Sequence, residues 1–116
     1  MNTHKDLDVW KLSIDLVEKI YSITNQFPAQ EKYGLNNQLQ RSAVSVPSNI
    51  AEGAARSSDK DYIRFLYISL GSLSELETQL IIAERIKYLK SLEILEDIKQ
   101  IRKKLLNLIK YLKDNT

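Results

Sequence analysis

The sequence predicts an all-α protein in which residues 1–116 form a single domain, an antiparallel four-helix bundle of the up-down-up-down kind. Apolar residues recur at every third or fourth position in four separate segments, which is the period of one helix face. The segments that join them are short, so neighbouring helices are expected to run antiparallel. Glycine and proline number only 3 and 2, and no segment alternates apolar and polar residues as a strand does.

The first two helices are expected from about Asp6 to Gln26 and from about Leu35 to Arg56, with Phe27-Pro28 ending the first. The apolar stripe of the first helix is predicted to be Leu7, Trp10, Ile14, Val17, Tyr21 and Thr24. The stripe of the second is predicted to be Leu35, Leu39, Ala43, Val46, Ile50 and Ala54.

Pro47 lies inside the second helical pattern. It cannot donate a hydrogen bond to the carbonyl of Ala43, and its ring crowds that carbonyl, so we expect a kink there. The alternative is a pair of shorter helices broken at Pro47. Because the apolar stripe keeps its phase across this proline, the sequence favours one kinked helix.

The third helix is expected to start after Ser58, since Ser58 and Asp61 have the spacing of a capping box with an acid at the third helical position. Its apolar stripe is predicted to be Tyr62, Leu66, Ser69, Leu73, Leu76, Leu80 and Ala83. The fourth helix starts near Ser91, with acids in its early turns and lysines in its last, an order that complements the helix dipole. Its stripe is predicted to be Leu95, Ile98, Ile101, Leu105, Leu108 and Leu112.

Composition excludes most catalytic and metal chemistry. There is no cysteine and one histidine, so disulfides, thiol nucleophiles, zinc sites and di-iron sites built from two Glu-x-x-His motifs are all ruled out. Glu75 and Glu77 are two residues apart on a helix and point about 200° from each other, so they cannot share a substrate. We therefore expect no enzyme activity, no metal and no cofactor.

The expected location is the cytoplasm, without contact to a membrane. The longest uncharged stretch, residues 65–74, falls far short of the ~20 apolar residues that cross a bilayer. The first residues lack the apolar segment of a signal peptide.

A polar stripe runs beside the apolar stripe of the second helix, and a shorter one follows the third helix. Serine, asparagine and glutamine at these positions favour contact with another protein surface, while a solvated face with hydrogen bonds between helices is the alternative. Gly71-Ser72 is expected to allow a close approach of helices. The stripes are Gln38, Ser42, Ser45, Asn49, Glu52 and Arg56, then Ser72, Glu75 and Gln79.

Charge is unevenly distributed along the chain. From Arg85 to Thr116 there are nine basic and four acidic residues, although the whole chain carries only +2. A basic helix can contact phosphate, and Tyr88 and Tyr111 could stack on bases. The alternatives are a solvated face and tyrosines that cover the ends of the bundle. The basic residues of the helix are Lys99, Arg102, Lys103, Lys104, Lys110 and Lys113.

The sequence resembles a small four-helix-bundle family named after proteins encoded in intervening sequences of bacterial 23S rRNA genes. The accessory variability protein of diversity-generating retroelements is a relative. The resemblance covers essentially the whole chain, and the Asn-Ile-Ala-Glu-Gly stretch with the downstream Gly-Ser is its specific part. It is carried by Phe27-Pro28, Glu31-x-Tyr33-Gly34-Leu35, Gln38, Arg41, Ser45, Asn49-Ile50-Ala51-Glu52-Gly53, Arg56, Phe65-Leu66, Gly71-Ser72 and Glu75-Leu76-Glu77.

The resemblance implies a ring-like homopentamer without established catalysis. It also implies nucleic acid and a reverse transcriptase as partners, which the retroelement relatives bind through a basic surface. We expect a non-enzymatic accessory protein that binds structured RNA or DNA, the alternative being a protein-interaction scaffold. Phosphate contacts are expected from Arg41, Arg56, Lys99, Arg102, Lys103 and Lys104. A polar network between subunits or helices is expected from Gln38, Ser45, Asn49, Glu52, Ser72 and Glu75.

Overall fold

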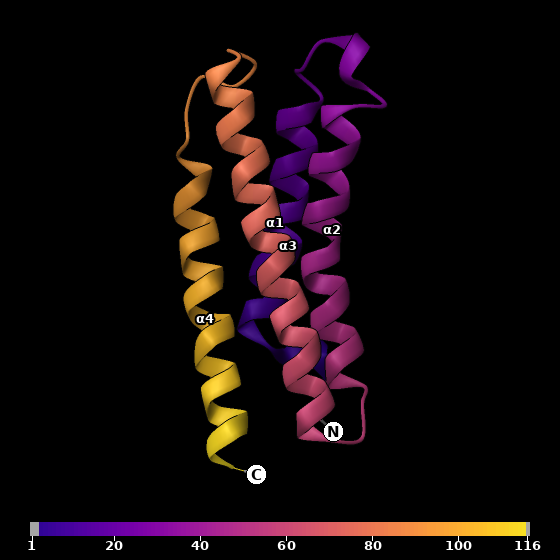
Figure 1. Ribbon diagram of the computed structural model, residues 1–116, viewed down its shortest axis with the longest axis vertical. Coiled ribbons are helices and arrows are strands. Elements are labelled where there is room, and N and C mark those ends of the chain that lie inside the picture. The colour runs from indigo at the N-terminus through magenta and orange to yellow at the C-terminus, as the bar shows by residue number, and fades with distance from the viewer. Residues whose placement is uncertain (1–2, 116) are drawn as a thin grey trace.

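The computed structural model describes residues 3–115 and contains four long helices arranged side by side (Figure 1). They are α1 (Asp8–Thr24), α2 (Leu35–Ala54), α3 (Asp59–Arg85) and α4 (Ile94–Asp114). Short 3-10 turns precede α1 and α2, at His4–Asp6 and Ala29–Glu31. The described residues contain no strand, so the predicted all-α fold is confirmed. The bundle is elongated, measuring 47 × 21 × 20 Å.

The helices occupy the four corners of the bundle in chain order. α2 packs against α1 and α3, and α4 packs against the same two helices. Over residues 3–115, α2 and α4 make no direct contact, so they lie at opposite corners. Because α2 and α4 are diagonal to each other, predicted site residues on these two helices lie on different surfaces of the bundle.

The core contains most of the apolar stripes that the sequence predicts for α2, α3 and α4. On α4, Leu95 and Leu108 are only partly buried, and Ile94 and Ile109, outside the predicted stripe, are buried. The predicted residues Leu35, Ala54 and Tyr62 are also only partly buried. Leu39, Val46 and Ile50 are fully buried on α2, and Leu66, Leu73, Leu76 and Leu80 are fully buried on α3. On α4 the fully or nearly fully buried residues are Ile98, Ile101 and Leu105. Burying one such side chain stabilises the fold by about 1.5–3 kcal/mol, so these three stripes hold the bundle together.

The predicted stripe of α1 is only partly correct. Thr24 is buried, and Leu7, Trp10 and Val17 are partly buried and pack against the core. The other buried positions are Val9, Ser13, Leu16 and Ile20, whereas Tyr21 is 47% exposed. Two rows with helical spacing lie one position apart in α1, so periodicity alone allowed two overlapping stripes. Packing against α2 and α4 selects the one that includes Leu16 and Ile20.

α2 is one continuous helix through Pro47, so the alternative of two helices broken at this residue is wrong. The proline is buried between its neighbours, and the adjacent Val46 carbonyl accepts a hydrogen bond from the Ser69 hydroxyl of α3 at 2.9 Å. That bond links the proline-containing turn to the neighbouring helix. The kink itself stays a prediction.

The glycine at the close contact between helices is Gly53, not Gly71. A Cβ atom on Gly53 would lie 2.9 Å from the Cβ atom of Phe65 and 3.1 Å from the carbonyl oxygen of Tyr62. A Cβ atom on Gly71 would meet nothing within 4 Å, and Gly71 is exposed. The expectation that Gly71 allows close approach inside the bundle is therefore wrong.

Both ends of α3 are fixed by local hydrogen bonds. At the start, the Ser58 hydroxyl accepts a bond from the Asp61 backbone N–H at 3.2 Å, which confirms the predicted cap. At the end, Lys87 adopts a left-handed conformation with φ of 70°. The backbone N–H groups of Tyr88 and Lys87 donate to the carbonyls of Ala83 and Glu84, which is a Schellman motif.

Candidate functional site

The polar stripes of α2 and α3 meet in a seam between the two helices. The Ser42 hydroxyl lies 2.8 Å from Oε1 of Glu75 and 3.0 Å from Oε1 of Gln79. A hydroxyl carries one proton, so the Ser42 hydroxyl donates to the Glu75 carboxylate. If the side-chain amide of Gln79 is rotated by 180°, its NH2 group donates to the Ser42 oxygen. Ser42 and Gln79 are buried, whereas Glu75 is exposed at the edge of the seam.

A second group of hydrogen bonds continues the seam toward the end of α2. The hydroxyls of Ser45 and Ser72 are 2.7 Å apart. The Asn49 Nδ2 donates to the carbonyl oxygen of Ser45 at 2.8 Å and to its hydroxyl at 2.9 Å. The seam therefore joins α2 to α3 within one chain. This agrees with the alternative that the polar stripes form hydrogen bonds between helices.

The remaining predicted network residues lie outside this chain of bonds. Gln38 is exposed and lines the rim of a groove of about 410 Å³ above the seam. Glu52 pairs with Arg56 one turn along α2, with 2.8 Å between Oε1 and the guanidinium nitrogen. The structure thus brings together Ser45, Asn49 and Ser72 in one hydrogen-bonded group, and Glu75 with Ser42 in another.

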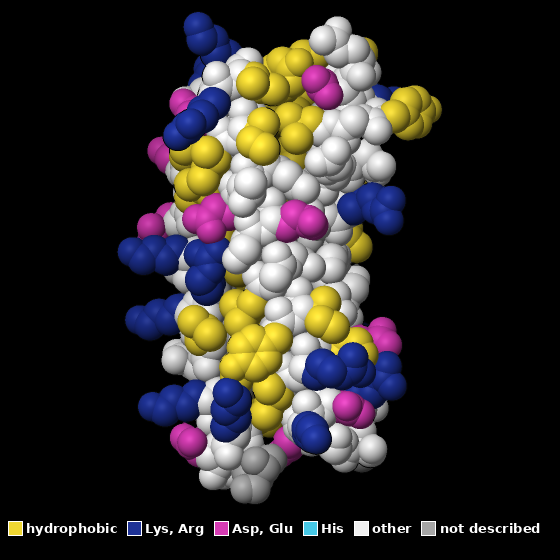
Figure 2. Space-filling view, in the orientation of Figure 1, with side chains coloured by type: hydrophobic (Ala, Val, Ile, Leu, Met, Phe, Trp, Pro, Cys, Tyr) yellow, Lys and Arg dark blue, Asp and Glu magenta, His cyan; other side chains and the backbone are white. Residues whose placement is uncertain are grey.

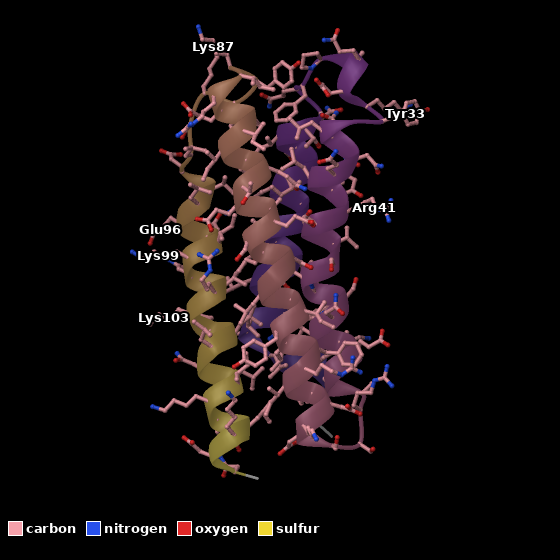
Figure 3. The ribbon with its side chains drawn as sticks, viewed as in Figure 1. Tyr33, Arg41, Lys87, Glu96, Lys99 and Lys103 are labelled. Carbon is pink, nitrogen blue, oxygen red and sulfur yellow. The ribbon has the colours of Figure 1, made fainter. Side chains whose placement is uncertain are left out.

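The lysines of α4 form a row on its outer face. Lys99, Lys103 and Lys110 are exposed and follow one another by four and seven residues, so they share one side of the helix. Figure 2 shows dark blue side chains projecting along this edge, and Figure 3 shows Lys99 and Lys103 pointing away from the bundle. Within residues 3–115, none of the three forms an ion pair within 4 Å. We call Lys99, Lys103 and Lys110 the lysine row.

Of the other positive charges of α4, Arg102 and Lys113 bond to side chains of α3, and Lys104 is exposed. The guanidinium of Arg102 lies 2.6 Å from the carboxylate of Glu77 on α3, and both side chains are about two-thirds buried. Lys113 donates to the Tyr67 hydroxyl at 3.0 Å. Lys104 is exposed on the flank of α4, about 100° around the helix from Lys103. Arg102 is therefore engaged inside the bundle, and its availability for phosphate is reduced.

The two predicted arginines of α2 lie at the opposite corner. Arg41 is exposed and points away from the bundle on the side opposite Lys103 (Figure 3). Arg56 pairs with Glu52, and its guanidinium lies 4.7 Å from the ring centroid of Phe65. The six residues predicted to contact phosphate are thus divided between two separate surfaces.

Glu75 and Glu77 point to different neighbours, as their spacing predicts. Glu75 accepts a bond from Ser42 of α2, and Glu77 pairs with Arg102 of α4. His4 lies in the first 3-10 turn, with its ring 5.2 Å from that of Trp10 in an edge-on contact. Among residues 3–115, no group of three or more histidine or acidic side chains is arranged to hold a metal ion.

Tyr88 closes one end of the bundle. Its hydroxyl donates to the Glu31 carboxylate at 2.9 Å, and its ring lies 5.6 Å from that of Phe27. The hydrogen bond to Glu31 and partial desolvation raise the pKa of Tyr88 above 10.0. Tyr111, by contrast, is 62% exposed on α4.

Comparison with known proteins places the chain in a family. Residues 5–113 match the 23S rRNA-intervening sequence protein family. The chain belongs to this family. Among solved structures, it is similar to a protein of unknown function from the S23 ribosomal protein family of Bacteroides thetaiotaomicron. That similarity has a TM-score of 0.79 and 28% identity, and covers 88% of this chain and 98% of the other. No curated protein matches.

In this 23S rRNA-intervening sequence protein, the residues of the Asn-Ile-Ala-Glu-Gly stretch have separable structural roles. Asn49 bonds to Ser45, Ile50 is buried in the core, Glu52 pairs with Arg56, and Gly53 allows the contact with Phe65. No helix over residues 3–115 has the length and apolar character needed to cross a membrane.

Proposed function

We propose that this family member is a non-enzymatic accessory protein that binds structured RNA or DNA through the lysine row of α4. The observation that supports this is the row itself, three exposed lysines on one helix face without an acidic partner among the described residues. An unpaired lysine keeps its full charge for a phosphate, and neutralising phosphates releases counterions. Lys104 adds a fourth exposed charge on the flank of the helix.

The dimensions of the row suit a nucleic-acid backbone. Lys99 and Lys110 are eleven positions apart, which corresponds to about 16 Å along the helix axis. A straight row of this length can follow consecutive phosphates of one strand. The contacts are to phosphate, so this row would position a nucleic acid without reading its sequence.

Self-association would multiply this effect. We propose the homopentamer that the family resemblance implies, with five lysine rows in one particle. Tethered rows raise the effective concentration of each further contact, so modest affinity per chain becomes strong binding by the assembly. The expected native mass is five times the chain mass of 13.4 kDa. A reverse transcriptase stays a predicted partner from the resemblance alone.

The test is a charge reversal with a matched control. Lys99, Lys103 and Lys110 are changed together to glutamate, and a control protein carries Lys11, Lys60 and Lys90 changed to glutamate. All six lysines are exposed, so both variants lose the same charge without disturbing the core. Binding of a labelled RNA hairpin is measured by fluorescence anisotropy at about 50 and about 200 mM salt. Three phosphate contacts on a duplex would weaken binding roughly 40-fold over that range.

We expect the row variant to lose affinity and most of the salt dependence, while the control keeps both. Equal loss in the two variants would mean that net charge alone attracts the RNA. Absence of binding by the unaltered protein at low salt would reject the proposed function.

The rival function is a protein-interaction scaffold, and the outer face of α3 favours it. Exposed residues follow one another there by three or four positions: Ile68, Gly71, Glu75, Thr78 and Ile82. A mid-helix glycine with open space above it costs about 1 kcal/mol relative to alanine. No contact within the described chain compensates for that cost, and a second copy packed closely on this face would.

The native mass of two surface variants tests whether the outer face of α3 forms a contact between copies. Ile68→Glu places a charge on the outer face of α3, and Leu106→Glu does the same at an exposed apolar residue of α4. Light scattering after size exclusion should give a reduced mass for Ile68→Glu alone. Equal masses for both variants and the unaltered protein would remove α3 from the interface.

A further inference from the structure

A second polar groove lies between α1 and α2, at the end of the bundle that carries the loop joining them. It has a volume of about 780 Å³ and continues along α2 into a depression of about 360 Å³. Both hollows are lined by Tyr21 and Gln40. We call this continuous space the amide groove, and its key side chains are Tyr21, Lys32, Tyr33, Asn36, Gln40 and Arg41.

Two tyrosines of the amide groove present their rings to solvent. Tyr33 is 85% exposed and Tyr21 is 47% exposed. Tyr33 projects from the bundle (Figure 3), and the ammonium group of Lys32 lies 5.5 Å from its ring centroid. Neither ring belongs to the hydrophobic core. Exposed aromatic faces of this kind are platforms on which nucleobases stack, because every base has a π-face.

The amides of Asn36 and Gln40 are held by one residue of α1. Nδ2 of Asn36 donates to the Thr24 carbonyl at 3.0 Å, and Nε2 of Gln40 donates to the Thr24 hydroxyl at 3.0 Å. Thr24 is itself buried, with its hydroxyl 2.9 Å from the Ile20 carbonyl. The donor side of both amides is therefore directed toward α1 and fixed there.

The acceptor sides of the two amides differ in accessibility. Within the described chain, Oδ1 of Asn36 is buried and has no hydrogen-bond partner, so a ligand in the groove does not reach it. No donor bonds to Oε1 of Gln40, and this atom is not among the buried ones. A ligand that carries an N–H group would satisfy the Gln40 oxygen.

The charge of the amide groove selects an anionic ligand. The two charged residues that line it, Lys32 and Arg41, are both cationic, and no acidic side chain lines it among the described residues. Glu31 lies close in sequence, but its carboxylate accepts bonds from Tyr88 and from the Leu35 backbone N–H. A phosphate at the rim would therefore meet positive charge alone.

We propose that the amide groove binds an unpaired nucleotide whose base carries an exocyclic amino group. The base stacks on Tyr33, its amino group donates to Oε1 of Gln40, and its phosphate meets the positive charge supplied by Lys32 and Arg41. Adenine and cytosine present such an amino group on the base edge and uracil does not. This site lies on the α2 side of the bundle, away from the lysine row, and its occupation does not require the row to bind.

The proposal is tested with labelled ten-nucleotide oligo(A) and oligo(U), titrated by fluorescence anisotropy at about 50 mM salt. Tyr33→Ala removes the stacking platform without touching the core, and Tyr111→Ala removes another exposed tyrosine, from α4, as a control. Loss of one stacked base should weaken oligo(A) binding roughly 5- to 150-fold in Tyr33→Ala. Tyr111→Ala should bind as the unaltered protein does. Gln40→Leu should reduce the preference for oligo(A) over oligo(U).

A second experiment detects ligand binding in the groove by NMR spectroscopy. In a ¹⁵N-labelled protein, adenosine monophosphate should shift the side-chain amide signals of Gln40, and ribose 5-phosphate should not. Unmoved amide signals, equal binding by the two tyrosine variants, or no preference for oligo(A) would each overturn the proposal. A lower native mass of Tyr33→Ala would also overturn it, because the groove would then be a contact between copies. If the lysine-row variant loses hairpin binding but still binds oligo(A), the groove is supported independently of the row. If Tyr33→Ala loses oligo(A) binding but still binds the hairpin, the row is supported independently of the groove.

Discussion

Gly53 of α2 and Phe65 of α3 lie at a close contact between the two helices. A Cβ atom on Gly53 would lie 2.9 Å from the Cβ atom of Phe65, a distance that real Cβ contacts do not reach. The Phe65 ring is in turn covered by the guanidinium groups of Arg56 and Arg64, each 4.7 Å from its centroid. This contact sets the separation of α2 and α3 at the end of the seam that carries Asn49.

Gly53→Ala is expected to destabilise the protein by about 1–3 kcal/mol, because the added methyl group meets backbone and Cβ atoms that cannot move aside. Gly71→Ala is the matched control, since its methyl group has open space and alanine is the better helix former by about 1 kcal/mol. Urea unfolding followed by circular dichroism measures both. Opposite signs are predicted, and a stabilised Gly53→Ala would show that α2 and α3 are not in close contact at this position.

Arg102 and Lys103 are expected to have different roles although they are adjacent. Arg102→Ala breaks the bond to Glu77, and a double-mutant cycle with Glu77→Ala should give a coupling energy of about 0.5–1 kcal/mol for this partly exposed pair. Lys103→Ala removes an exposed charge and should leave the free energy of unfolding unchanged. Affinity for the RNA hairpin should fall more in Lys103→Ala. The reverse order of affinities would place Arg102 at the phosphate surface.

Tyr88→Phe should make the protein less stable, because the Glu31 carboxylate loses its donor. The pKa of Tyr88 is raised in the folded state above 10.0, so the bond stabilises the protein fully below that pH and the stabilisation is lost as pH rises through the folded pKa. Melting temperatures of the two proteins should therefore differ at pH 8 and converge above about pH 10. A constant difference across this range would contradict the role of the phenol proton.

Lys87→Gly should stabilise the protein by about 1 kcal/mol, because Lys87 is the non-glycine residue in the left-handed position of the Schellman motif. Glycine adopts this conformation without the steric cost of a Cβ atom. Thermal unfolding measures the effect, and Lys90→Gly, at another exposed residue of the same loop, is the control. Destabilisation by Lys87→Gly would mean that the lysine side chain itself contributes at this position.

Much of the fold could be predicted because its signals are local. The stripes of α2, α3 and α4 follow the three- and four-residue spacing, and the serine cap of α3 needs only the spacing of Ser58 and Asp61. α1 contains two rows with this spacing, one position apart, so its buried side depends on the neighbours that pack against it. Gly53 and Gly71 look alike in sequence, and only the distance to α3 distinguishes them.

The candidate site depended more heavily on packing. Arg102 and Lys103 are equivalent in a count of charges, yet one faces Glu77 and the other faces solvent. The sequence pointed to Arg41 but not to the rest of the amide groove, because Lys32, Tyr33, Asn36 and Gln40 form no motif of their own. Tyr21 joins them only when α1 packs against α2.

The sequence by itself determined the number of helices, their approximate ends and the absence of thiol chemistry, because periodicity, caps and composition are properties of neighbouring residues. Only the tertiary structure decided which charges are paired, which glycine lies at a helix contact, and that Arg41 and the lysine row lie at opposite corners. These depend on distances between residues that are remote along the chain, and such distances are fixed only when the four helices pack together.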